Sequence, residues 1–130
     1  MAKMVQVSTN VGALKDVLLN KHNAHEIGVQ ISNTGVSAGT DGRKIIPAGT
    51  PIGGTTSALE DRDVVLKVTN SSSDGANSQG ILRYDVDVTN GNANGTMIVM
   101  GVVDSSKCPA IDPTVKTALT HIIFQNGGTN

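Results

Sequence analysis

Two histidines and a glutamate near the N-terminus carry side chains that could bind a metal. His22 and His25 have nearly the spacing of two ligands one helical turn apart, and Glu26 adds a carboxylate. Zinc sites need three or four ligands in a fixed geometry, and neither a cysteine nor a third histidine lies near these residues. We therefore interpret residues 21–26 as a polar turn and expect no metal site there.

Three aspartates could bind a hard cation if neighbouring strands brought them together. Asp85, Asp87 and Asp104 lie within or directly after apolar segments, and carboxylate oxygens are the ligands that Ca²⁺ prefers. The spacing of a Ca²⁺-binding loop with its closing glutamate does not occur in the sequence. The pattern therefore favours a charged, outward-facing surface over a cation site.

Cys108 and His121 are the thiol and imidazole that could act as nucleophile and base. Cys108 precedes Pro109 without the local signature of a thiol enzyme, and a lone cysteine is usually a small buried hydrophobe. We also expect no Gly-x-Ser-x-Gly nucleophile elbow, no phosphate-binding glycine loop and no dinucleotide fingerprint. We predict no catalytic residue, no cofactor and no metal, which indicates a binding or structural module. An enzyme with dispersed catalytic residues is the alternative.

Charge and hydropathy exclude two classes of partner. The chain of 130 residues has a net charge of −1, with its lysines and arginines scattered singly, so no basic face could neutralise a row of phosphates. No apolar run is long enough to span a bilayer, and the N-terminus lacks the pattern of a signal peptide. We expect a soluble protein with neither a nucleic-acid nor a membrane partner.

Aromatic residues are scarce, because Tyr84 and Phe124 are the only two in the sequence. The core must therefore be built from Val, Ile, Leu, Ala and Met, which bury less apolar area per residue than large aromatic rings. Oligomerisation is a common remedy for a small domain of this kind. The composition thus favours an oligomer. A single cysteine excludes an internal disulfide bond.

Residues 80–104 must form the centre of the fold. Leu82, Tyr84, Val86 and Val88 alternate with polar residues, which predicts a strand with one buried face. Residues 97–103 form an apolar run that predicts an antiparallel neighbour covered on both faces. The intervening segment NGNANG, residues 90–95, predicts a turn at each Asn-Gly pair.

The remaining segments predict a fold rich in strands. We expect strands over 27–31, 64–69 and 122–124, an edge strand with a rigid turn over 44–54, a helix over 113–119 capped by Asp112, a short helical turn over 11–20, and loops over 32–43 and 70–79. The predicted class is mostly β (α+β): a small compact β-barrel or sandwich-like domain with one or two short helices and an N-terminal arm. Residues 1–43 would form the arm and a contact segment, and residues 44–130 the core.

The order of these motifs resembles one protein family. IIPAGTPI at residues 45–52, GILRYDVDVTNGNANGT at 80–96, MIVMGVVD at 97–104 and PTVKTAL leading into HIIF at 113–124 resemble the head decoration proteins of tailed bacteriophages. The likeness is to the lambda-type decoration family and to the base of some phage head fibre proteins. Residues 11–43 have no counterpart in the family pattern.

The resemblance implies a structural role in the virion. It implies a homotrimer on the outer surface of the mature phage head, where a decoration or cement protein binds the major capsid protein and stabilises the viral capsid against internal DNA pressure. In the family an N-terminal arm makes the capsid contact. The matching residues here lie within 1–10, and the capsid-binding positions would be Met4, Val5, Val7 and Thr9.

Two other functions are compatible with the sequence. A host-surface-binding β module, such as a head fibre or a tail-associated adhesin, would need a surface for glycans or cell proteins, and the scarcity of aromatic residues counts against it. A small hydrolase would depend on Cys108 or His121. Each predicts a different assay, namely binding to cells or turnover of a substrate.

Overall fold

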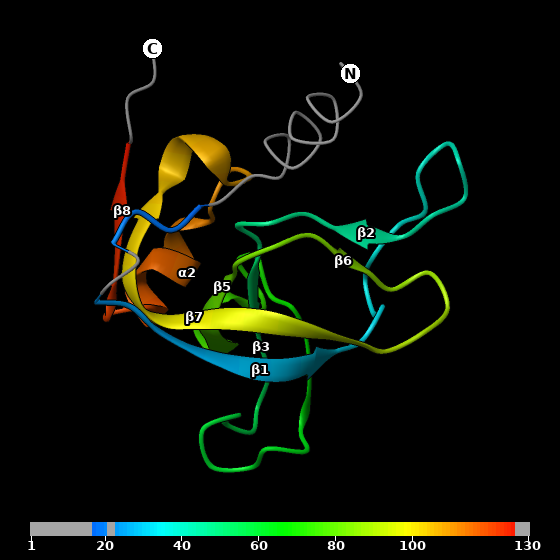
Figure 1. The fold of residues 1–130 in the computed structure, drawn as a ribbon, viewed down its shortest axis with the longest axis horizontal. Helices are drawn as coiled ribbons and strands as arrows, with labels where there is room; N and C mark the ends of the chain where they lie inside the picture. The colour runs from blue at the N-terminus through cyan, green and yellow to red at the C-terminus, as the bar shows by residue number, and fades with distance from the viewer. Residues whose placement is uncertain (1–16, 21–22, 127–130) are drawn as a thin grey trace, which may run out of the picture.

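The computed structural model describes residues 17–20 and 23–126 (Figure 1). In these residues the elements follow the chain as β1 (His25–Ile31), β2 (Ile45–Ile46), β3 (Pro51–Gly53), β4 (Val65–Val68), the 3₁₀ turn η1 (Gly75–Asn77), β5 (Ser78–Leu82), β6 (Val86–Asp87), β7 (Ala93–Asp104), the 3₁₀ turn η2 (Ser105–Lys107), α2 (Pro113–Ala118) and β8 (Ile122–Gln125). The predicted class is confirmed, because the structure is mostly β.

Five strands close into a barrel. Their order is β1, β4, β3, β5 and β7, and β7 pairs again with β1. Neighbours are antiparallel except β1 and β4, which are parallel. A ring with an odd number of strands cannot alternate in direction all the way round, so one parallel pair is required. Closure also pairs strands that would otherwise be exposed sheet edges.

The main core takes side chains from every barrel strand and from the segments around β2 and β6. On β1, Val29 and Ile31 point inward, whereas Gly28 and Gln30 between them are exposed. This alternation is the period of two that a half-buried strand requires. The buried members of this core are Val29, Ile31, Ile46, Ile52, Ala58, Leu66, Leu82, Val86, Val88 and Met97.

A second core lies outside the barrel, under α2. Ile81 is the neighbour of Leu82 on β5, and Ile98 is the neighbour of Met97 on β7. Because Leu82 and Met97 point into the barrel, Ile81 and Ile98 point out of it, where they pack with Val115 of α2. The long strand β7 continues past the barrel, and β8 pairs with its second half in parallel (Figure 1). Residues 17–20 run along the other side of β7 through the bridge between Leu18 and Val103.

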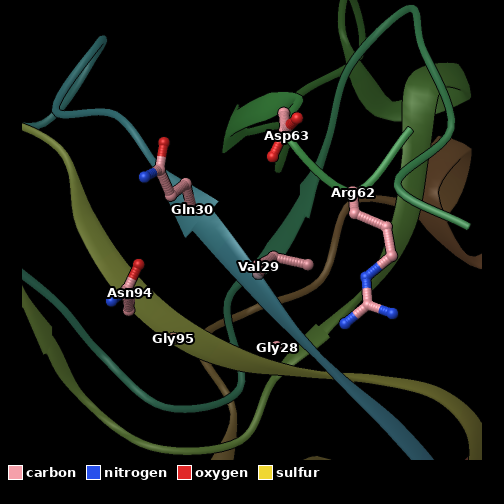
Figure 2. A pocket seen from close by; sticks show the side chains of 7 residues that line it. All are labelled: Gly28, Val29, Gln30, Arg62, Asp63, Asn94 and Gly95. Carbon is pink, nitrogen blue, oxygen red and sulfur yellow. The ribbon is translucent and has the colours of Figure 1, made fainter.

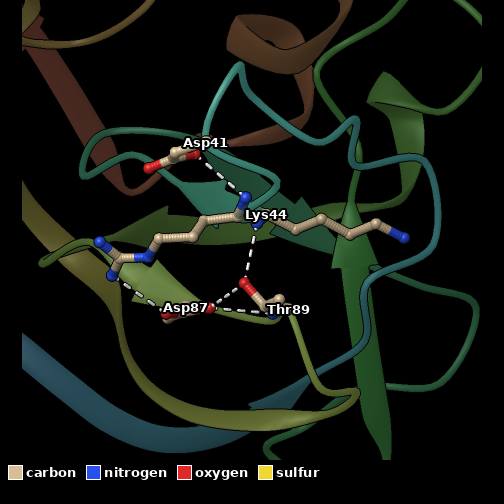
Figure 3. Close-up of polar contacts among 5 residues, drawn as sticks. Asp41, Lys44, Asp87 and Thr89 are labelled. Carbon is tan, nitrogen blue, oxygen red and sulfur yellow. Dashed lines mark hydrogen bonds and ion pairs between the residues drawn. The ribbon is translucent and has the colours of Figure 1, made fainter.

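β2 and β6 form a short ribbon beside the barrel, held by polar contacts at one end (Figure 3). Arg43 Nη2 lies 3.1 Å from Asp87 Oδ2, and Thr89 donates to Asp87 Oδ1 through both its hydroxyl and its N–H. The Lys44 N–H in turn donates to Thr89 Oγ1 at 2.9 Å. The hydrogen bonds from Thr89, and then the one from Arg43, lower the pKa of Asp87 to about 2.

Most of the predicted elements are confirmed. β1, β4, β7 and β8 occupy the predicted strand segments, and residues 32–43 contain turns without strand or helix. The helix α2 begins as predicted, because the Asp112 side chain accepts a hydrogen bond from the Thr114 N–H and Pro113 occupies the first turn. Gly91 makes the turn before β7 with a φ of 123°, which glycine adopts readily because it has no Cβ.

The strand predicted over residues 82–88 is interrupted. β5 ends at Leu82, and the chain then leaves β7 so that β6 can pair with β2. Asp85 fixes this departure, since its Oδ1 accepts from the Ala48 N–H at 2.7 Å. Tyr84 is exposed as a result, instead of buried, and its ring lies beside the guanidinium of Arg83, at 5.0 Å.

Four other expectations are wrong in whole or in part. β3 is an inner strand between β4 and β5, not an edge, and it tolerates Pro51 because the proline is its first residue. Asn94 and Gly95 belong to β7 and not to a turn, and β5 begins at Ser78 within the segment predicted as a loop. Of the helical turn predicted over 11–20, residues 17–20 are extended along β7, while 11–16 lie outside the described residues.

Candidate functional site

The residues predicted to contact a capsid cannot be placed. Met4, Val5, Val7 and Thr9 lie outside the described residues, so their role stays a prediction. Residues 25–31, which the sequence pattern placed in the same N-terminal segment, form β1 and are part of the barrel. The boundary predicted at residue 43 therefore does not separate β1 from the core.

Of the candidate metal ligands, His25 and Glu26 are described. Glu26 forms an ion pair with Arg83, and His25 is exposed at the start of β1, while His22 lies outside the described residues. In the described ranges, no group of three or more histidine, cysteine or acidic side chains lies close enough to hold a metal ion.

The three aspartates each have a separate structural partner. Asp85 accepts from a backbone N–H of the β2–β3 segment, and Asp87 pairs with Arg43. Asp104 is buried at the end of β7, where its carboxylate caps η2 by accepting from the N–H and hydroxyl of Ser106. These carboxylates stabilise turns instead of converging on one cation.

Cys108 and His121 also have different surroundings. The Cys108 thiol donates to the Asp104 carbonyl at 3.4 Å, and a Cβ placed on Gly49 would lie 2.8 Å from its sulfur. His121 is exposed, and its backbone carbonyl accepts from the Gly101 N–H at 3.2 Å. Cys108 thus fills space beside a glycine turn, as a small hydrophobe does.

The sequence contains a Gly-x-Ser-x-Gly motif, which we expected to be absent. Residues 35–39, GVSAG, match Gly-x-Ser-x-Gly, the pattern around the nucleophile of many hydrolases. That chemistry requires a sharp turn from a strand into a helix, which lifts the serine above the sheet. Here the segment lies in the loop between β1 and β2, and β2 follows it instead of a helix. The motif therefore does not form a nucleophile elbow.

A row of exposed apolar side chains crosses three neighbouring strands beyond the barrel. Val102 of β7 aligns with Ile123 of β8 on one side, and the Leu19 N–H donates to the Val102 carbonyl on the other. Aligned residues on neighbouring strands share a face, and Met100, two residues earlier on β7, lies on it too. We call Leu19, Met100, Val102 and Ile123 the apolar face.

The opposite side of the same strands explains why this face is left open. Leu18, Val103 and Ile122 point toward α2 and are buried in the second core. Their neighbours must therefore point to solvent, and Leu19, Met100 and Ile123 are 43%, 46% and 60% exposed. An exposed apolar cluster of this kind is typical of an interaction surface.

A cleft runs along β1 on another side of the barrel (Figure 2). One side of the cleft is formed by β1 with Asn94 and Gly95 of β7, and the other side by Arg62 and Asp63 in the loop before β4. The volume is about 480 Å³, and an adjoining hollow of about 320 Å³ continues it past Leu59 toward the start of β1. We call the two together the β1 cleft.

The sequence gives a partial signal for the apolar face and none for the cleft. Two successive isoleucines at residues 122–123 indicate a strand with two apolar faces, but not which of the two faces is exposed. The cleft depends on where β4 begins relative to β1, which no local pattern encodes. No helix among the described residues has the length and apolarity needed to cross a bilayer. No protein-family model matches the sequence, and no curated protein matches it significantly.

Proposed function

We propose that this protein is a capsid decoration protein that binds the outer surface of a mature phage head and stabilises the shell. The observation that carries the proposal is the order of the four motifs between residues 45 and 124, which resembles that of phage head decoration proteins. These residues run from β2 to β8 and include most of the barrel. The proposed partners are the major capsid protein and two further copies of the chain in a homotrimer.

The apolar face supports a role in assembly. It lies at the edge of the fold, next to Val17, where the described chain is continuous with the proposed N-terminal arm. A contact made by the arm and this face together would be modest in each copy. Many identical copies on one shell would nevertheless stabilise it, since each trimer engages several subunits at once and effective concentration multiplies weak contacts.

Particles with and without the protein test the function. We expect mature heads that lack it to release their DNA at a lower temperature, and addition of the purified protein to restore retention. Equal DNA retention in the two kinds of particle would reject the stabilising role. Deletion of residues 1–10 should leave the barrel folded and abolish binding to the heads, which circular dichroism and sedimentation with particles would measure.

A matched pair of variants tests the apolar face. Ile123→Asp places a charge on it, whereas Asn92→Asp adds the same charge at an exposed position before β7, outside this face. We expect Ile123→Asp to lower occupancy on the heads at least about tenfold, as expected when a charge must be desolvated at an interface. Asn92→Asp should bind like the wild type. Equal binding by both variants would exclude this face from the contact.

A further inference from the structure

The β1 cleft exists because β4 begins late. β4 is the neighbour of β1 on this side, but the two pair only at Gln30 with Val65 and at Ile31 with Leu66. Earlier residues of β1 pair with β7 on the other side and face the loop of residues 54–64 across the cleft. The first part of β1 is therefore an open strand edge inside an otherwise closed barrel.

The direction of the backbone groups on this edge follows from one hydrogen bond. The Ser32 N–H donates to the Leu66 carbonyl of β4, so even-numbered residues here direct their N–H and C=O toward β4. Pairing of β1 with β7 is regular from Glu26 to Ile31, so Gly28 and Glu26 direct theirs to the same side. In the part of the chain that the structure describes, no backbone hydrogen bond joins either residue to the loop across the cleft.

The walls of the cleft fit a polypeptide strand better than a compact ligand. Gly28 has no side chain, and a Cβ built on it would meet no heavy atom within 4 Å, so another chain can approach closely. Leu59, 63% exposed, offers an apolar contact at one end. From Glu26 to Gln30 the edge is about 13 Å long at the usual rise of a strand, which is room for about four residues of an added strand.

Arg62 and Asp63 both line the main part of the cleft, but only Arg62 also lines the adjoining hollow, so the charge of Arg62 indicates the side chain that the strand would carry. Arg62 lines both parts of the cleft next to Gly28, and it forms no ion pair or hydrogen bond with a described residue. Figure 2 shows its guanidinium extending along β1. Glu26, the acidic residue of the same strand, is already paired with Arg83. The guanidinium is thus available to an acidic side chain of a partner.

We propose that the β1 cleft binds an extended peptide segment of another protein as an added β-strand, with an acidic side chain of that segment paired to Arg62. The backbone groups of Gly28 and Glu26 would supply the hydrogen bonds, and Leu59 would contact an apolar neighbour of the acidic residue. The proposal does not depend on the decoration role, since the cleft and the apolar face are formed by different residues.

Amide hydrogen exchange of the full chain gives the first test. We expect the Gly28 N–H to exchange fast in the isolated protein, whereas the N–H groups of Ile27 and Val29, which face β7, exchange slowly. Addition of the peptide acetyl-Thr-Val-Glu-Val-Thr-amide should slow exchange at Gly28. Protection of Gly28 already in the isolated chain would mean that its own residues, or those of a second copy, occupy the edge, and would overturn the proposal.

The charge is tested with a second peptide and two variants. Replacing the glutamate of the peptide by lysine should weaken binding about tenfold or more, and Arg62→Glu should reverse this preference. Lys107→Glu makes the same change of charge at an exposed position of η2 that does not line the cleft, and it should bind like the wild type. An unchanged preference in Arg62→Glu would overturn the role of Arg62.

Blocking the cleft tests the site itself. Gly28→Ile places a β-branched side chain at a position where a Cβ meets no heavy atom within 4 Å, so the barrel should remain folded. Peptide binding, measured by NMR chemical-shift changes in the protein, should be lost in this variant. Gln125→Ile adds the same side chain at an exposed position on β8 and should leave binding unchanged. Binding retained by Gly28→Ile, or no binding by the wild type at millimolar peptide, would reject the site.

Discussion

The guanidinium of Arg83 pairs with the carboxylate of Glu26, a residue 57 positions earlier in the chain. Arg83 directly follows β5, and Glu26 lies near the start of β1, so the pair joins two strands on opposite sides of β7. Their side chains are 16% and 25% exposed. Partial burial reduces screening by water, so this ion pair should be stronger than one on an open surface.

A double-mutant cycle should measure this difference. We expect Glu26→Gln and Arg83→Met to show a coupling free energy of about 1 kcal/mol in urea unfolding. The pair between Lys67 and Asp74, at 3.6 Å with both side chains more than a third exposed, is the control, and Lys67→Met with Asp74→Asn should couple by less than about 0.5 kcal/mol. Equal coupling in the two cycles would show that burial does not strengthen the first pair.

Two glycines in neighbouring parts of the barrel should respond in opposite ways to alanine. A Cβ on Gly80 would overlap the Ile98 carbonyl oxygen and lie 2.5 Å from Met97 Cγ, so β5 and β7 would have to separate. We expect Gly80→Ala to lower the free energy of unfolding by about 2 kcal/mol or more. Gly28→Ala meets open space and should change it by less than about 0.5 kcal/mol, or raise it slightly. Thermal and urea unfolding of the two variants would compare them.

The sequence predicted the elements that local residue patterns determine. Residues 27–31 alternate because one face of β1 fills the barrel, and Asp112 with Pro113 predicted the start of α2 because capping is a local interaction. The break after Leu82 was not predictable in this way. It depends on Asp85 bonding to Ala48, a contact between segments far apart in the chain.

The candidate sites depend still more on long-range pairing. The apolar face requires residues 17–20, β7 and β8 to align, and no periodicity reveals which of two apolar neighbours points outward. The β1 cleft arises from the late start of β4, a matter of register between strands more than 30 residues apart. Sequence patterns identified the strands themselves, but not how far each one extends beside its neighbour.

Acid should weaken the ribbon of β2 and β6. The pKa of Asp87 is lowered from 3.8 to about 2 by Thr89 and Arg43, so the ionised carboxylate favours the folded state. Its contribution is present above about pH 4 and is lost as the pH falls from about 4 to about 2. NMR titration of the side-chain carboxyl should give the low value, and Thr89→Val should raise it. An Asp87 that titrates near 3.8 in the wild type would contradict the contacts in Figure 3.

Adjacent isoleucines on β8 should differ sharply in their contribution to stability. Ile122 is buried in the second core, and Ile123 is 60% exposed on the apolar face. Ile122→Ala should therefore lower the free energy of unfolding by about 2–4 kcal/mol, through lost burial and the cavity left behind. Ile123→Ala should change it by less than about 0.5 kcal/mol. Because successive residues of a strand face opposite ways, the reverse result in urea unfolding would mean that β8 is shifted by one residue along β7.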